Sequence, residues 1–125
     1  MGTIRSFEDM LSWQKARAFN KKIYDVSLSE NFGRDFELGR QIRRASLSIT
    51  SNIAEGFERR TDNEFLFFLN VAKGSIGEVR SQLYLASDLG YINKTQCDNL
   101  LAEATEISKM LAGFMKYLET KSGKR

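Results

Sequence analysis

Arginine is the residue type in this chain that is best suited to binding a ligand, and it is concentrated in one segment. Residues 34–60 contain six arginines and no lysine. The planar guanidinium group suits bidentate contacts with phosphate. Two of these arginines closely follow Phe57, and a basic group beside an aromatic ring is typical of surfaces that bind RNA or DNA. The predicted nucleic-acid-binding set is Arg40, Arg43, Arg44, Arg59 and Arg60, extended by Lys15, Lys21 and Lys22.

The same arginines have a second interpretation. The formal net charge of the chain is only +3, which favours a merely solvated face. The arginines would then form salt bridges between subunits with Glu37, Glu55, Glu58 or Glu78. Self-association would favour nucleic-acid binding over this second interpretation, because a ring repeats each weakly basic patch and adds phosphate contacts.

Catalytic and metal-binding residues are scarce. The chain has no histidine and one cysteine, which removes zinc fingers, Ser-His-Asp triads and Cys-His nucleophiles. The carboxylate pairs Glu55 with Glu58 and Glu103 with Glu106 are one helical turn apart, but di-metal bundles complete such pairs with histidine. We interpret them as surface carboxylates. The sequence predicts no catalytic residue, no metal site and no cofactor, so we expect a protein that is not an enzyme.

The cysteine count and the hydropathy also bear on location. A single cysteine cannot form a disulfide within the chain, which suits a reducing compartment. No stretch approaches the roughly 18 apolar residues of a membrane span. Glu8 and Asp9 interrupt any apolar run near the start, so no signal peptide is expected. We expect a cytoplasmic protein without a membrane partner.

The elements that must position these residues are helices. The chain has 125 residues, enough for one domain, and no proline. Apolar residues recur every three or four positions in segments of about 8–29, 35–55, 62–89 and 94–119, and the tail at 120–125 is expected to fray. Four long helices with short connections predict an all-α fold, an antiparallel up-down-up-down four-helix bundle over residues 1–125.

Capping residues mark the expected helix ends. N-caps favour hydroxyl and amide side chains, and C-caps favour a following glycine. Cys97 falls on the apolar face of the last helix, where we expect a small buried hydrophobe. The expected N-caps are Ser6, Thr61 and Asn93, with Glu64 and Gln96 completing capping boxes, and the expected C′ residues are Gly56 and Gly90.

The second and third helices carry more apolar residues than an isolated bundle needs, because each has a second apolar face. One explanation is a scatter of exposed apolar residues, which most proteins tolerate. The other is a homo-oligomer, which buries both faces of a helix without a second gene product. We favour self-association into a ring-like homo-oligomer. The expected interface consists of Phe36, Leu47 and Ala54 on the second helix and Phe67, Val71, Gly74 and Leu85 on the third.

Three blocks of the sequence resemble a known family. The first joins Phe7–Asp9 to Trp13–Ala16, the second is Gln41–Gly56, and the third joins Gln82–Ala86 to Asp88–Ile92. In order and spacing they resemble the four helix bundle protein family, whose members include proteins encoded in intervening sequences of bacterial 23S rRNA genes. The resemblance implies an antiparallel four-helix bundle that forms a homopentamer. It also implies kinship with the accessory protein of diversity-generating retroelements, a basic pentameric barrel that binds nucleic acid and a reverse transcriptase.

The chain departs from the family pattern at Thr50, where the family usually has proline. Thr50 restores a backbone N–H donor. We therefore expect a straighter helix, or a bend held by Ser and Thr side chains that bond back to carbonyls. Asn52 and Glu55 follow, and we expect them to form a buried or interfacial hydrogen-bond site with a structural role.

Two hypotheses for the function remain open. The first is an oligomeric accessory protein that binds nucleic acid, with RNA favoured by the genomic setting of the family. The second is a protein-interaction scaffold whose arginines serve subunit interfaces. The expected partners are accordingly a second copy of this chain, RNA or DNA, and a protein partner.

Overall fold

The computed structural model describes residues 4–123, and every regular element in that range is a helix. A 3-10 turn, η1, spans Phe7–Asp9 and precedes five α-helices, of which the second is very short. The helices are α1 (Leu11–Ser27), α2 (Glu30–Arg34), α3 (Phe36–Phe57), α4 (Asp62–Asp88) and α5 (Lys94–Gly123). The predicted all-α fold is confirmed.

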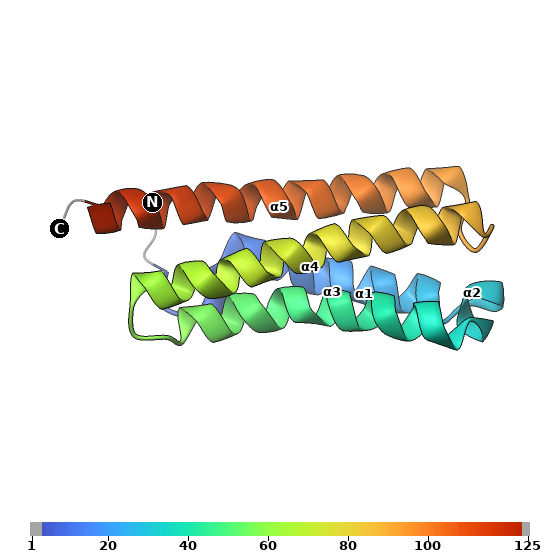
Figure 1. The fold of residues 1–125 in the computed structure, drawn as a ribbon, viewed down its shortest axis with the longest axis horizontal. Coiled ribbons are helices and arrows are strands. Elements are labelled where there is room, and N and C mark those ends of the chain that lie inside the picture. The colour runs from blue at the N-terminus through green and yellow to red at the C-terminus, as the bar shows by residue number, and fades with distance from the viewer. Residues whose placement is uncertain (1–3, 124–125) are drawn as a thin grey trace.

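The four long helices lie lengthwise beside one another (Figure 1). α3 packs against both α1 and α4, and α5 packs against α4 and α1. In Figure 1, α4 and α3 lie toward the viewer, α5 runs along the top and α1 lies behind. Each long helix runs opposite to the long helix before it. The outer surfaces of α3, α4 and α5 extend along the molecule.

The core follows the apolar periodicity of the sequence. Leu69, Ile76 and Leu83, seven residues apart on α4, are at most 1% exposed, and Ile49 of α3 is fully buried. Cys97 is also buried, as predicted, with its sulfur 3.7 Å from the carbonyl oxygen of Leu83. Burial of each large aliphatic side chain stabilises the fold by about 1.5–3 kcal/mol. These buried residues therefore determine which faces of α3 and α4 point outward.

The predicted capping box at Asn93 is complete, whereas at Thr61 the Glu64 carboxylate bonds to the capping hydroxyl instead of the Thr61 N–H. The Thr61 hydroxyl accepts a hydrogen bond from the backbone N–H of Glu64 at 3.2 Å and donates to the Glu64 carboxylate at 3.1 Å. At the start of α5, the Asn93 side-chain oxygen accepts from the N–H of Gln96, and the Gln96 side-chain oxygen accepts from the N–H of Asn93. These bonds satisfy helix N–H groups that lack a partner within the helix.

Tyr91, in the turn between α4 and α5, contacts both α2 and the start of α3. Gly90 has a φ of 76°, a left-handed conformation that suits glycine, and it is the predicted C′ residue. Tyr91 stacks on Phe32 of α2 with ring centroids 5.2 Å apart and donates its hydroxyl to Asp35 at 2.9 Å. Asp35, the N-cap of α3, also accepts the N–H of Leu38. That backbone bond, followed by the tyrosine bond, lowers the pKa of Asp35, and Asp35 raises the pKa of Tyr91.

Three expected helix boundaries are wrong. α1 begins at Leu11 rather than near residue 8 because η1 precedes it, and the side chain of Ser6 makes no capping bond. The segment after α1, expected to be a break, contains the helix α2. α5 continues through Gly123 instead of ending near residue 119. Residues 124–125 of the expected tail lie outside the described residues.

Gly56 lies inside α3 and is not the C′ residue that we predicted. The helix continues to Phe57, and Gly56 is buried. A Cβ atom at this position would lie 2.8 Å from Cδ1 of Phe65 and 2.9 Å from Cβ of Phe68. Those contacts are closer than carbon atoms tolerate, so glycine is needed here because α3 and α4 approach closely.

Candidate nucleic-acid and assembly surfaces

Arg43 joins α3 to α1 and does not belong to a free basic surface. Its Nη1 donates to the Ser27 hydroxyl at 3.0 Å and to the Ser27 carbonyl oxygen at 3.4 Å, at the last residue of α1. The guanidinium carbon lies 5.9 Å from the centre of the Tyr24 ring. A cation at this position satisfies a terminal carbonyl and interacts favourably with the helix dipole. The predicted phosphate contact of Arg43 is therefore not supported by its position.

Arg59 is also engaged by its own chain. It forms ion pairs with Glu55 at 3.2 Å and Glu64 at 3.9 Å, and its guanidinium lies 4.7 Å from the centre of the Phe68 ring. Phe57, which the sequence placed beside this arginine, is half-buried and packs edge-on against Phe65. The predicted basic and aromatic pairing with Phe57 is therefore replaced by a pairing with Phe68.

The three lysines of the predicted set all form ion pairs within the chain. Two of these pairs join α1 to α5, and one lies within α1. Because the side chains are largely exposed, each pair contributes about 0–1 kcal/mol. The pairs are Lys15 with Glu106 at 3.6 Å, Lys22 with Glu103 at 2.9 Å and Lys21 with Asp25 at 3.1 Å.

Arg40, Arg44 and Arg60 are the predicted basic residues that remain without an acidic partner among the described residues. All three are exposed. Arg40 and Arg44 are one turn apart on the outer surface of α3, and Arg60 lies in the connection to α4. The eight predicted residues are thus spread over three parts of the fold instead of one patch.

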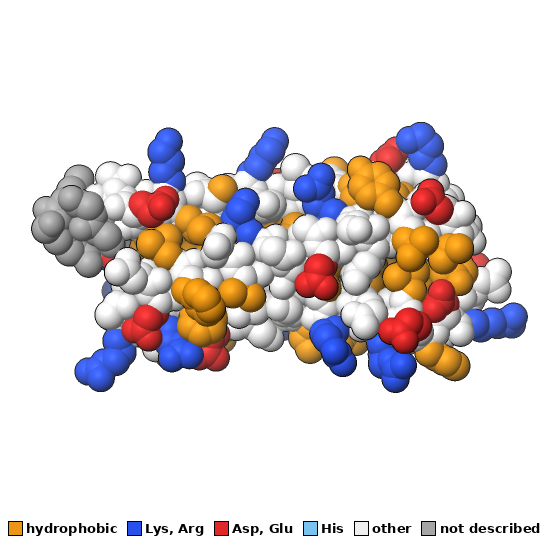
Figure 2. Space-filling model, in the orientation of Figure 1, with side chains coloured by type: hydrophobic (Ala, Val, Ile, Leu, Met, Phe, Trp, Pro, Cys, Tyr) orange, Lys and Arg blue, Asp and Glu red, His pale blue; other side chains and the backbone are white. Residues whose placement is uncertain are grey.

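α4 has an outward stripe of residues spaced by four and three. Within it, Phe67 is 63% exposed and Leu85 is 46% exposed. Figure 2 shows apolar groups on this face, separated by small and charged side chains. A Cβ atom at Gly74 or at the nearby Gly77 would meet no atom of the chain within 4 Å. We name residues 67, 71, 74, 78, 81 and 85 the α4 outer stripe: Phe67, Val71, Gly74, Glu78, Ser81 and Leu85.

Nothing within the described chain requires glycine at these two positions. Glycine in a helix interior is less stable than alanine by roughly 0.5–1 kcal/mol. The two glycines keep this stretch of α4 narrow, so another helix could approach its backbone. Gly74 belongs to the interface predicted from the sequence, and the structure adds that the space above it is open.

The outer surface of α3 carries the other residues of the predicted oligomer interface. Phe36 is 73% exposed and Leu47 is 49% exposed, whereas Ala54 is half-buried. Arg40 and Arg44 lie along the same outer surface. Any partner that covers Phe36 and Leu47 therefore also covers these arginines.

Thr50 belongs to a polar cluster between α1 and α3. The amide nitrogen of Asn20 donates to the Thr50 hydroxyl oxygen at 2.8 Å, and the Asn20 side-chain oxygen accepts from the Ser46 hydroxyl. Thr50 donates in turn to the carbonyl oxygen of Leu47 at 3.1 Å, the back-bonding expected from its sequence. α3 is a continuous helix through this position.

Asn52 and Glu55 do not form one site. Asn52 is half-buried and donates its amide to the carbonyl and hydroxyl oxygens of Ser48 at 2.8 and 2.9 Å. Ser75 of α4 donates to the same hydroxyl at 2.8 Å, so this group links α3 to α4. Glu55 is exposed and pairs with Arg59. The structural role predicted for Asn52 fits its position, whereas Glu55 is not buried.

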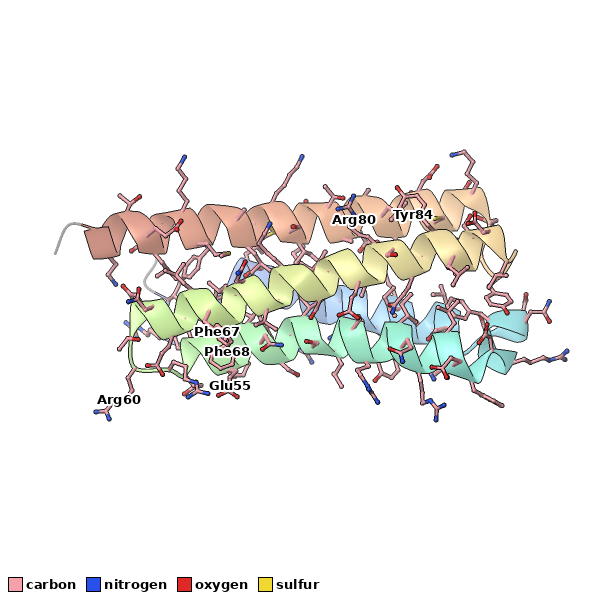
Figure 3. The ribbon with its side chains drawn as sticks, in the orientation of Figure 1. Glu55, Arg60, Phe67, Phe68, Arg80 and Tyr84 are labelled. Carbon is pink, nitrogen blue, oxygen red and sulfur yellow. The ribbon has the colours of Figure 1, made fainter. Side chains whose placement is uncertain are left out.

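An open groove runs between α4 and α5 that the sequence pattern did not reveal. Its volume is about 740 Å³. Arg80 and Tyr84 line it from α4, and both lie where α4 meets α5 (Figure 3). Leu101, Thr105 and Lys109 line it from α5. These residues come from separate helices, so no local motif could have indicated their proximity.

Two further features can be stated for residues 4–123. No group of three Cys, Asp or Glu side chains is placed to hold a metal ion. None of the helices in this range is long and apolar enough to span a membrane.

Comparison with known proteins identifies the family. The sequence profile of the 23S rRNA-intervening sequence proteins matches residues 8–113. The chain belongs to this family. The structure is similar to that of a protein of unknown function from the S23 ribosomal protein family of Bacteroides thetaiotaomicron. The two share 28% identity and a TM-score of 0.78 over 85% of this chain and 99% of the other. No curated protein matches the sequence.

The matched region contains the outer surface of α3, the α4 outer stripe and the lining of the groove. It ends at residue 113, before the last turns of α5. The three surfaces therefore lie within the part of the chain that defines the family, although the family match by itself assigns no role to any of them.

Proposed function

We propose that this protein is a non-catalytic four-helix bundle that assembles as a ring-like homo-oligomer and that the oligomer binds nucleic acid, with RNA favoured. The resemblance to the family suggests five subunits. The protein acts in the cytoplasm, without a cofactor and away from the membrane. The observation that carries the proposal is the α4 outer stripe, which exposes Phe67, Val71 and Leu85 and is narrow at Gly74.

The stripe supports self-association in two ways. Its spacing of four and three residues repeats that of the buried stripe on the other side of α4, a pattern typical of a helix packed on both sides. Gly74 in the stripe and Gly77 beside it lower the stability of the isolated helix without serving the fold. A contact with another helix would account for both features.

A ring places different surfaces of neighbouring subunits in contact, because a cyclic assembly of more than two copies uses heterologous interfaces. The outer surface of α3 suits the α4 outer stripe of a neighbour. It presents Phe36 and Leu47 together with two arginines that lack acidic partners among the described residues. The stripe presents Phe67 and Leu85 together with the exposed Glu78. Apolar and charged groups are therefore complementary across this pairing.

Nucleic-acid binding is supported by cations that the fold leaves uncompensated. Arg60 on the α3–α4 connection and Arg80 on α4 have no ion pair within residues 4–123. A ring multiplies each such charge by the number of subunits, and polyanion binding gains with each phosphate neutralised. The family is named for its occurrence in 23S rRNA intervening sequences, which favours RNA.

The assembly is tested by light scattering of the wild-type chain and of the variant Phe67→Asp/Leu85→Asp. We expect the wild type to form an oligomer and this variant to be monomeric but folded. Tyr117→Asp is the matched control, because Tyr117 is 53% exposed on α5, away from the stripe. A monomeric wild-type protein at micromolar concentration would refute the proposed assembly.

A scaffold without nucleic-acid binding is the second candidate function. It is favoured by the position of Arg40 and Arg44 beside Phe36 and Leu47, since an interface there would bury the arginines. The RNA affinity of the wild-type oligomer separates the two functions, because a scaffold assembles without binding RNA. The variant Arg40→Ala/Arg44→Ala is expected to weaken the oligomer in both, since both place these arginines at a subunit interface. Arg43→Ala is less informative, because Arg43 is bonded within the subunit.

A further inference from the structure

We infer that the groove between α4 and α5 is the place where a single strand of nucleic acid binds. The inference rests on the proposed function and assigns its nucleic-acid contacts to residues outside the set predicted from the sequence. The groove is open to solvent and has a volume of about 740 Å³. An open groove between two helices that lie side by side suits an extended chain better than a small molecule, which usually binds in an enclosed pocket.

The charge of the groove is positive where a phosphate could reach it. Arg80 and Lys109 line it from opposite helices, and neither forms an ion pair within the described residues. Two carboxylates also line it, but each is ion-paired to a lysine outside the lining. These pairs are Asp98 with Lys94 at 2.9 Å and Glu106 with Lys15 at 3.6 Å. The two acids are thus compensated, and the two cations are not.

The positive charge continues along both helices. Lys73 precedes Arg80 by seven residues, and Lys116 follows Lys109 by seven, so each pair occupies one helix face about 10 Å apart. Lys73 donates to the neutral Ser108 hydroxyl across the α4–α5 seam at 3.2 Å, a contact that leaves its charge uncancelled. Lys73 and Lys116 lie outside the lining of the groove and extend the positive charge along α4 and α5, an arrangement that can track a phosphate backbone.

Tyr84 supplies the surface for a base. It is 55% exposed, lines the groove beside Arg80, and has no ring partner among the described residues (Figure 3). An exposed aromatic ring next to phosphate-binding cations is the combination that binds single strands without sequence preference. An acidic peptide would use the cations but would gain little from this ring. The aromatic contact therefore favours nucleic acid as the occupant.

The test measures the affinity of the full-length oligomer for fluorescein-labelled single-stranded RNA and DNA of about 20 nucleotides by anisotropy at several salt concentrations. Arg80→Ala/Lys109→Ala is expected to make the negative slope of log K against log salt shallower by about 1.4, since each phosphate contact to a single strand contributes roughly −0.7. Tyr84→Ala is expected to weaken binding by about 5- to 100-fold, and Tyr84→Phe is expected to bind like the wild type.

Matched controls separate the groove from other surfaces. Tyr117→Ala removes an equally exposed tyrosine elsewhere on α5 and should leave the affinity unchanged. Arg60→Ala removes an exposed cation of the α3–α4 connection that lies outside the groove and outside the proposed subunit interface. Light scattering and circular dichroism of each variant verify that assembly and folding are preserved.

The outcomes distinguish this inference from the proposed function. Loss of affinity in the groove variants, with the Tyr84→Phe and Tyr117→Ala variants unaffected, supports the groove. Wild-type affinity in both groove variants overturns the groove but keeps nucleic-acid binding, and a loss of affinity in the Arg60→Ala variant would then place the binding at the α3–α4 connection. If the wild-type oligomer binds neither probe, nucleic-acid binding itself is refuted.

Discussion

Two glycines inside helices should respond in opposite ways to replacement by alanine. A Cβ atom at Gly113 of α5 would meet no atom within 4 Å, whereas a Cβ atom at Gly56 of α3 would lie 2.8 and 2.9 Å from carbon atoms of Phe65 and Phe68. Both residues are inside regular helix. The pair therefore isolates the effect of tertiary packing from the effect of helix propensity.

The expected magnitudes follow from these distances. Alanine in a helix interior is more stable than glycine by about 0.8–1.0 kcal/mol, so Gly113→Ala should raise the free energy of unfolding by that amount. Gly56→Ala gains the same propensity but forces α3 and α4 apart, and overpacking of this kind costs typically 1–3 kcal/mol. The net change for Gly56→Ala is then about 0 to 2 kcal/mol of destabilisation.

Urea denaturation followed by circular dichroism measures both variants, at a protein concentration where the wild type is in one association state. Gly113 lies outside the α4 outer stripe, so its replacement should not alter assembly. Equal stabilisation by the two substitutions would refute the argument, because it would mean that Gly56 does not set the distance between α3 and α4. Destabilisation by Gly113→Ala would show that the open space beside it is used.

Three further predictions concern bonds between elements. Thr50→Val leaves the Asn20 amide without its acceptor and should lower the free energy of unfolding by about 1–3 kcal/mol in urea denaturation; an unchanged midpoint would contradict the polar cluster. Arg43→Met keeps the aliphatic stem but loses the bonds to Ser27, so stability should fall by about 1 kcal/mol while RNA affinity measured by anisotropy stays constant. Because the pKa of Asp35 is lowered in the folded state, its contribution to stability is present above the unfolded pKa of about 4 and is lost as the pH falls through the folded value. Asp35→Asn should therefore flatten the pH dependence of stability below about pH 4, and an unchanged profile would argue against the bond.

The long helices could be predicted from the sequence because apolar periodicity reports burial directly. The short helix α2 could not, since five residues are too few for a periodic signal. Its one buried side chain, Phe32, is held by Tyr91, which lies far along the chain. Gly56 was misassigned for a related reason. A glycine after a helix and a glycine inside one look alike in sequence, and only the position of α4 distinguishes them.

The sequence predicted which helix face each candidate residue lies on, but it did not predict which residues of other helices it contacts. The pattern correctly placed Phe36 and Phe67 on outer surfaces. It could not predict that Arg43 binds the end of α1, because that contact depends on how α1 and α3 pack. The groove escaped prediction for the same reason, since Arg80 and Lys109 lie on different helices and share no local motif.

The α4 outer stripe and the groove share one helix, and this couples assembly to binding. Leu85 follows Tyr84 and Ser81 follows Arg80, and consecutive helical residues point about 100° apart. A neighbouring subunit seated on the stripe would therefore stand beside the groove and repeat it around the ring. The variant Phe67→Ser/Leu85→Ser breaks assembly without changing charge. We expect it to bind the RNA probe more weakly than the wild type, because a monomer offers one groove where the ring offers several. Equal affinity of this monomer and the wild-type ring would mean that each groove binds independently and that assembly serves another purpose.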